Sequence, residues 1–185
     1  MSTVKKWLLV LVLILAIASV ALLAGYCGSP SQEDYQNRAA DGTSETAPAT
    51  KEIVAESKVN GTIYETDKFS ILQPDGWKVT VSPGGVLFEK GEYAMMVNVG
   101  DATGSTEAFL KELVEKMAEQ QNGTPVEEVT MFAGKFFRTR FTLEGKDTTE
   151  AWGLTNGLAV NLVMIGKDHP NNVEIKAMLD SIKFK

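Results

Sequence analysis

The first segment of the chain is apolar almost without interruption. Residues 7–23 read WLLVLVLILAIASVALL, and Lys5 and Lys6 precede them. A helix that is apolar on every side enters a bilayer, and flanking lysines stay on the cytoplasmic side. We therefore predict that residues 1–26 are a signal peptide or a membrane anchor. The rest of the chain is expected on the extracytoplasmic side of the cell membrane.

Residues 27–58 have a different composition. They are rich in Ser, Thr, Ala, Pro, Asp and Glu, and they contain few large apolar side chains. Such a segment buries too little apolar surface to offset the entropy lost on ordering. We predict a disordered acidic linker over residues 27–58, with a short helix over residues 51–58 as the alternative.

Short stretches of alternating apolar and polar residues dominate residues 59–185. Residues 93–99, for example, place Tyr93, Met95 and Val97 on one side of an extended strand. The segment 158–165 is apolar on both sides, which is typical of a central strand covered on both faces. The predicted strands cover residues 62–64, 69–72, 77–81, 86–89, 93–99, 126–130, 135–143, 147–154 and 158–165, with an edge strand at 183–185.

Two further segments repeat apolar residues at helical spacing. One predicted helix starts at Ser105 as N-cap and ends near Gly123; the other follows Pro170, with Asn171 as N-cap. Their apolar stripes are Phe109, Leu110, Leu113, Val114 and Met117 in the first, and Ile175, Met178, Leu179 and Ile182 in the second. The predicted fold class is α+β: an antiparallel meander sheet with two packed amphipathic helices, preceded by an N-terminal apolar helix and a disordered tether.

Charge and rare residues exclude several functions. The net charge of −6 and the lack of a basic run in residues 59–185 argue against nucleic acid as a partner. The chain has one cysteine, Cys27, and one histidine, His169. An intrachain disulfide is therefore impossible, and a zinc site of Cys and His residues lacks ligands. We predict no metal and no cofactor. Because His169 stands before Pro170, we interpret it as a surface loop residue.

The end of the leader, Leu22-Leu23-Ala24-Gly25-Tyr26-Cys27, resembles a bacterial lipoprotein signal. In that signal small residues precede a cysteine that becomes lipidated. The resemblance implies lipid attachment at Cys27, with an acyl chain such as palmitate as the anchor. Tyr26 stands where the pattern has a small residue, so an uncleaved transmembrane helix remains the main alternative, followed by cleavage to a soluble protein.

A second resemblance extends over residues 60–185. Its motifs are Tyr64, Phe69-Ser70-Ile71, Pro74-Asp75-Gly76-Trp77 and the closing Leu179-Asp180-Ser181-Ile182-Lys183-Phe184. They resemble the PsbP-like and DcrB-like fold of many small bacterial lipoproteins. The resemblance implies that residues 59–185 form a PsbP-like α+β domain, and that this domain binds rather than catalyses.

Two arginines are the candidate ligand-binding residues. Arg138 and Arg140 share one face of a predicted strand, and guanidinium groups fit carboxylates and phosphates. The alternative is a solvated strand face, with the arginines paired across strands to Glu150. Trp77 and Trp152 are interpreted as core residues rather than as stacking platforms for a ligand.

These observations favour a membrane-anchored extracytoplasmic lipoprotein that is not an enzyme. We predict that it binds, or helps to assemble, an unidentified protein or envelope component, while its N-terminal lipid or helix binds the membrane. An extracytoplasmic protein that binds a small anionic ligand is the alternative. An enzyme, such as a hydrolase, is only the third hypothesis. No set of residues in the sequence forms a recognisable catalytic group.

Overall fold

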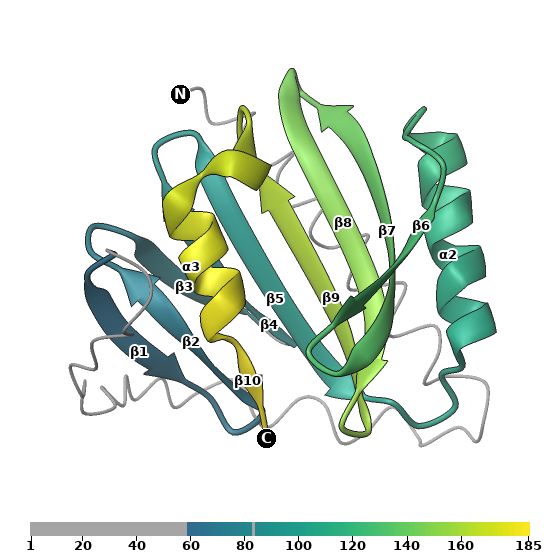
Figure 1. Cartoon of the computed structure of the whole chain (residues 1–185), viewed down its shortest axis with the longest axis horizontal. Helices are drawn as coiled ribbons and strands as arrows, with labels where there is room; N and C mark the ends of the chain where they lie inside the picture. The colour runs from purple at the N-terminus through teal and green to yellow at the C-terminus, as the bar shows by residue number, and fades with distance from the viewer. Residues whose placement is uncertain (1–58, 83) are drawn as a thin grey trace, which may run out of the picture. The chain divides into compact units, whose positions relative to one another are not determined.

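The computed structural model describes residues 59–82 and 84–185, and the predicted leader, linker and Cys27 lie outside this range (Figure 1). Every described residue belongs to one compact unit. Its elements are β1 (Gly61–Glu65), β2 (Phe69–Pro74), β3 (Lys78–Ser82), β4 (Gly85–Lys90), β5 (Tyr93–Asp101), α2 (Glu107–Gln120), β6 (Glu127–Met131), β7 (Gly134–Leu143), β8 (Lys146–Thr155), β9 (Leu158–Ile165), the 3₁₀ turn η1 (His169–Asn171), α3 (Val173–Ser181) and β10 (Lys183–Phe184).

The strands form two sheets, and every pairing between neighbours is antiparallel. The large sheet has the order β3-β4-β5-β9-β8-β7-β6, and the small sheet has the order β1-β2-β10. The α+β prediction is confirmed, but the prediction of one continuous meander is wrong. Strand β2 ends at Pro74, because proline has no N–H group to continue the hydrogen bonds of the sheet. The turn after Pro74 then leads the chain into the second sheet at β3.

The middle position of the large sheet belongs to β9, as the sequence pattern predicts. One face of this strand presents Val160 and Leu162, which are both fully buried, and the other presents Asn161, which is 1% exposed. The chain leaves β5, forms α2, β6, β7 and β8, and returns to pair β9 with β5. This long-range pairing joins the two halves of the sheet.

The main hydrophobic core lies between the large sheet and a layer made of α3 and the small sheet. In Figure 1 this layer stands in front of the large sheet. Ile175 and Met178 of α3 pack there with side chains of β2, β4, β5 and β9. The buried members of this core are Phe69, Ile71, Trp77, Val86, Phe88, Met95, Val97, Val99, Phe136, Ala151, Leu158, Val160, Leu162, Met164, Ile175, Met178 and Ile182.

The other face of the large sheet contacts α2 at the β7–β8 end. Leu110 and Val114 of this helix pack with Phe137 and Trp152 in a second, smaller cluster. Figure 1 shows α2 at the same end of the sheet as β6, β7 and β8. The two faces of the sheet therefore belong to two separate cores.

Both helix caps lie one residue later than the sequence predicts. The N-cap of α2 is Thr106 rather than Ser105, and its Oγ1 accepts a hydrogen bond from the Phe109 N–H at 3.2 Å. The N-cap of α3 is Asn172 rather than Asn171, because Asn171 belongs to η1. Both caps satisfy backbone N–H groups that the first helical turn leaves without partners.

The two described helices, α2 and α3, are short compared with a membrane-spanning helix. Within residues 59–82 and 84–185, neither α2 nor α3 combines the length and the apolar character that a span requires.

Candidate functional site

Arg138 is engaged in an ion pair at the sheet edge. Its Nε and Nη2 both donate to Glu127 Oε2, at 3.1 and 2.6 Å, across the β6–β7 pair. This contact holds the pKa of the Glu127 carboxyl below its ordinary value. Arg138 therefore stabilises the pairing of β6 with β7, and its charge is paired with that of Glu127.

Arg140 has a different environment, two residues further along β7. Its side chain is exposed and lines a groove of about 470 Å³. No ion pair forms between Arg140 and any other residue of the described part of the chain. The two arginines share one strand face as predicted, but only Arg140 enters the groove.

Three segments from different parts of the chain build the walls of this groove. They are the loop after α2 at Thr124, the β7–β8 hairpin and the η1 turn at His169. In Figure 1 the end of α2, the hairpin turn and η1 all lie at the upper end of the sheet. Thr124 positions Arg140 from one side: its Oγ1 accepts from the Arg140 N–H at 3.1 Å, and its N–H donates to the Arg140 carbonyl at 2.7 Å.

His169 is buried, and the prediction of a surface loop residue is wrong. Its side chain is 2% exposed, its Nδ1 donates to the Gly166 carbonyl at 3.0 Å, and its Nε2 lies 2.7 Å from Thr149 Oγ1. Because a carbonyl only accepts, Nδ1 carries the proton, and the Thr149 hydroxyl donates to Nε2 of the neutral ring. Both ring nitrogens are thus used to hold the η1 turn against β8.

The pKa of His169 is lowered from its ordinary value. Burial is the largest cause, because it penalises the charged imidazolium, and the nearby Arg140 charge acts in the same direction. The Gly166 carbonyl and the Asp147 carboxylate oppose this shift. At neutral pH the imidazole therefore adds no positive charge to the groove.

Two carboxylates, those of Asp147 and Asp168, line the same groove as Arg140. Asp147 Oδ2 accepts from the Asp168 N–H at 3.1 Å, and Asp168 Oδ1 accepts from Asn171 Nδ2 at 2.7 Å. Each carboxylate keeps one oxygen to which no donor of the described residues binds. The groove therefore combines one guanidinium group with two free carboxylate oxygens.

Glu150 lies on the opposite face of the sheet from the arginines, so its predicted pairing with them is wrong. Its register partner is Thr139, which lies between Arg138 and Arg140 and points to the other side of the strand. Glu150 is 8% exposed, and its Oε1 accepts from Trp152 Nε1 at 2.9 Å and Asn161 Nδ2 at 3.0 Å. Burial raises the pKa of Glu150, while these two donors lower it.

The chain of buried polar groups continues through Asn161 of β9 to Asn98 of β5. Asn161 Oδ1 accepts from Asn98 Nδ2 at 2.8 Å, and the Asn98 Oδ1 is buried without a donor among the described residues. Trp152 takes part in this chain through its indole N–H, and it is 4% exposed. Trp77 is 3% exposed. Both tryptophans are core residues, as the sequence analysis predicts.

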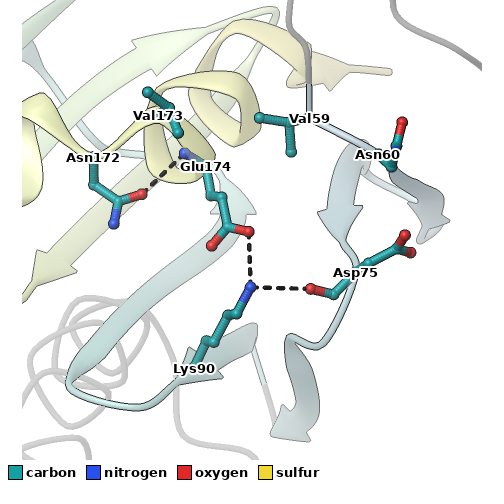
Figure 2. Close-up of a pocket in the computed structure, with 7 residues that line it drawn as sticks. All are labelled: Val59, Asn60, Asp75, Lys90, Asn172, Val173 and Glu174. Carbon is teal, nitrogen blue, oxygen red and sulfur yellow. Dashed lines mark hydrogen bonds and ion pairs between the residues drawn. The ribbon is translucent and has the colours of Figure 1, made fainter.

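A second pocket, of about 450 Å³, lies at the start of α3 (Figure 2). Lys90 Nζ donates to Glu174 Oε1 at 2.8 Å and to the Asp75 carbonyl at 3.1 Å, as the dashed lines show. Trp77 Nε1 donates to the other Glu174 oxygen at 2.9 Å. Lys90 and Glu174 are paired with each other here, and their contacts fasten α3 to β4 and to the turn before β3.

Asp147, Asp168 and Thr124 are groove residues that were not predicted from the sequence. A signal for Asp147 was present, because Glu144 and Gly145 form a two-residue turn with positive φ at both positions. This turn places Asp147 opposite Thr142, on the same sheet face as Arg140. Asp168 and Thr124 arrive from distant parts of the chain, and no local pattern indicates that they meet.

The described domain thus belongs to the class of α+β domains with a polar, charged groove at one end of an antiparallel sheet. No protein-family model and no curated protein sequence match the chain. Solved structures with a similar fold include the cyanobacterial PsbP protein, CyanoP, of Synechocystis sp. PCC 6803. That match has 10% identity and a TM-score of 0.46, and it covers 66% of this chain and 91% of CyanoP.

Two further solved structures show a comparable degree of similarity. LpqN of Mycobacterium tuberculosis, described as involved in cell envelope biogenesis, has 11% identity and a TM-score of 0.43, with 63% of this chain and 83% of LpqN covered. A Bacteroides thetaiotaomicron VPI-5482 protein has 13% identity and a TM-score of 0.42, with 63% of this chain and 45% of that protein covered.

Proposed function

We propose that this chain is an extracytoplasmic binding protein without catalytic activity, held at the membrane by its N-terminus. Its groove at Arg140 recognises the anionic group of an envelope component. The observation that carries this proposal is the Arg140 guanidinium, which is exposed in a groove and forms no ion pair within the described residues. A guanidinium group offers five N–H donors in a planar fork that suits carboxylate and phosphate oxygens.

The contrast between the two arginines supports this assignment. Arg138 has the same charge and points to the same sheet face, but it is paired with Glu127 through Nε and Nη2. A cation that serves only the fold is expected to have such a partner. Arg140 contributes its backbone to the contact with Thr124, and its side chain is left for another molecule.

Arg140→Gln is the direct test of the groove. We expect the full-length protein in detergent micelles to bind inorganic phosphate and phosphate monoesters weakly. Arg140→Gln is expected to weaken binding about tenfold or more, the loss of one charge-assisted hydrogen bond. Isothermal titration calorimetry measures the affinity, and Arg138→Gln is the matched control, with an affinity close to that of the unchanged protein. Unchanged affinity in Arg140→Gln, or no binding of any phosphate compound, contradicts the proposed function.

The proposed extracytoplasmic location at the membrane depends on the N-terminal sequence, in which Lys5 and Lys6 precede the apolar residues 7–23. We expect the protein purified from membranes to begin at Cys27 with an attached acyl lipid. Intact-mass spectrometry of the membrane fraction measures this directly. The Cys27→Ala variant is expected to keep the leader and to lack the lipid mass. An unmodified leader in the unchanged protein contradicts lipidation and supports the transmembrane alternative.

A second candidate function, binding or assembly of a partner protein, is favoured by the free edge of the large sheet. β3 is an edge strand, and Val81 on it is 67% exposed. Edge strands present unpaired N–H and C=O groups to which an extended peptide can add as a further strand. Absence of phosphate binding at Arg140 in the titration would favour this partner over an anionic ligand.

A further inference from the structure

The groove carries charges of both signs, so a simple anion matches only one part of it. Arg140 supplies one positive charge, whereas Asp147 and Asp168 supply two negative charges. His169 adds no positive charge at neutral pH, because its ring is buried and neutral. A phosphate or carboxylate that binds Arg140 would therefore lie near two carboxylates, which repel it.

The strand register places the opposite charges next to each other without joining them. Arg140 is paired with Thr149, and Asp147 with Thr142, so both charged side chains point to the same sheet face as diagonal neighbours. Such neighbours have Cα atoms roughly 7–8 Å apart. Their side chains are long enough to meet, yet no ion pair forms between them in the described part of the chain.

Both carboxylates are held in place by the protein. The Asp168 N–H binds one oxygen of Asp147, and the Asn171 amide binds one oxygen of Asp168. The second oxygen of each carboxylate remains available as an acceptor. These contacts fix the negative side of the groove while the guanidinium group of Arg140 provides the positive side.

We infer that the groove binds a zwitterion, with its anionic group on Arg140 and its ammonium group on Asp147 and Asp168. This inference rests on the proposed function and names the chemical class of the ligand. The class includes phosphoethanolamine, free or as a lipid headgroup, and amino acids. In each of these an anionic group and an ammonium group are separated by a short linker, and each charge meets its opposite in the groove.

The test compares two ligands that differ only in the ammonium group. O-phosphoethanolamine and n-propyl phosphate have similar size, but the second carries a methyl group in place of the ammonium. We expect the full-length protein in detergent micelles to bind phosphoethanolamine about three- to fivefold more tightly, as measured by calorimetry. This factor corresponds to one partly exposed charge pair.

Asp147→Asn is the variant that tests the negative side. It keeps an oxygen that accepts from the Asp168 N–H, and it is expected to remove most of the preference for phosphoethanolamine. Glu144→Gln removes the same charge from the adjacent turn, outside the lining of the groove, and is expected to keep the preference. Thermal unfolding of each variant verifies that it is folded.

The outcomes separate the inference from the proposed function. Equal affinity for the two ligands, or a preference that survives Asp147→Asn, overturns the inference alone. Phosphoethanolamine binding that survives Arg140→Gln, or no binding of either compound, overturns both. Glycerophosphoethanolamine and alanine identify the source: binding of the first supports a lipid headgroup, and binding of the second supports an amino acid.

Discussion

Replacing Gly153 with alanine is expected to lower the free energy of unfolding by about 1–3 kcal/mol, a typical cost of overpacking a core. Gly153 lies in β8 directly opposite Phe136 of β7, and the Phe136 ring covers it. A Cβ atom at residue 153 would lie inside the contact distance of three ring atoms. Phe136 is completely buried in the main core, so a shift of its ring would also displace its neighbours there.

Chemical denaturation of Gly153→Ala measures this loss, and Gly100→Ala is its control. Gly100 is also a strand residue, but a Cβ atom there would have no neighbour within 4 Å. We expect Gly100→Ala to change the free energy of unfolding by no more than about 0.5 kcal/mol. Phe136→Leu should restore part of the stability of Gly153→Ala, because the smaller side chain leaves room for the new methyl group. Equal stability of the two alanine variants would contradict the proposed ring contact.

Local signals in the sequence account for much of the fold. Gly145 and the Asn156–Gly157 pair mark the turns of two hairpins, and the structure joins β7 to β8 and β8 to β9 at these positions. The apolar residues on both sides of segment 158–165 identify the central strand. Patterns of this kind are readable because residues close in sequence determine them.

The pairings that the sequence does not reveal are those between distant segments. β5 pairs with β9, although α2, β6, β7 and β8 lie between them in the sequence. In the same way, Phe184 of β10 pairs with Phe69 of β2. Such contacts depend on which faces pack best once the hairpins exist. The predicted single meander failed for this reason, although nearly every strand in it was placed correctly.

The same limit applies to the candidate site. The strand pattern places Arg138 and Arg140 on one face, but the ion pair with Glu127 depends on the register of β6. The burial of His169 depends on Thr149, which lies twenty residues earlier in the sequence. Sequence alone therefore identified Arg140 as a candidate binding residue, but not the residues from other segments that line the groove with it.

Replacing Glu150 with alanine is expected to lower the free energy of unfolding by about 2–6 kcal/mol. The carboxyl oxygen of Glu150 accepts from Trp152 Nε1 and Asn161 Nδ2, both in buried side chains. Alanine leaves both donors without an acceptor, at about 1–3 kcal/mol for each. The contact with Glu150 also orients the Asn161 side chain. Without it, Asn161 Oδ1 is no longer held in position to accept from Asn98. Denaturant unfolding at several pH values measures the effect.

Glu150→Gln separates the hydrogen bonds from the charge. The amide keeps an oxygen for both donors but cannot ionise. Because burial raises the pKa of Glu150 above the 4.5 of the unfolded chain, the folded state favours the protonated carboxyl. This contribution is fully present below the unfolded pKa and is lost as pH rises through the folded pKa. The unchanged protein and the Glu150→Gln variant should therefore be equally stable at about pH 4. At about pH 8 the variant should be the more stable of the two. A loss of stability in Glu150→Gln that grows from about pH 4 to about pH 8 would show that the ionised carboxylate, rather than the neutral acid, is the form that the fold stabilises.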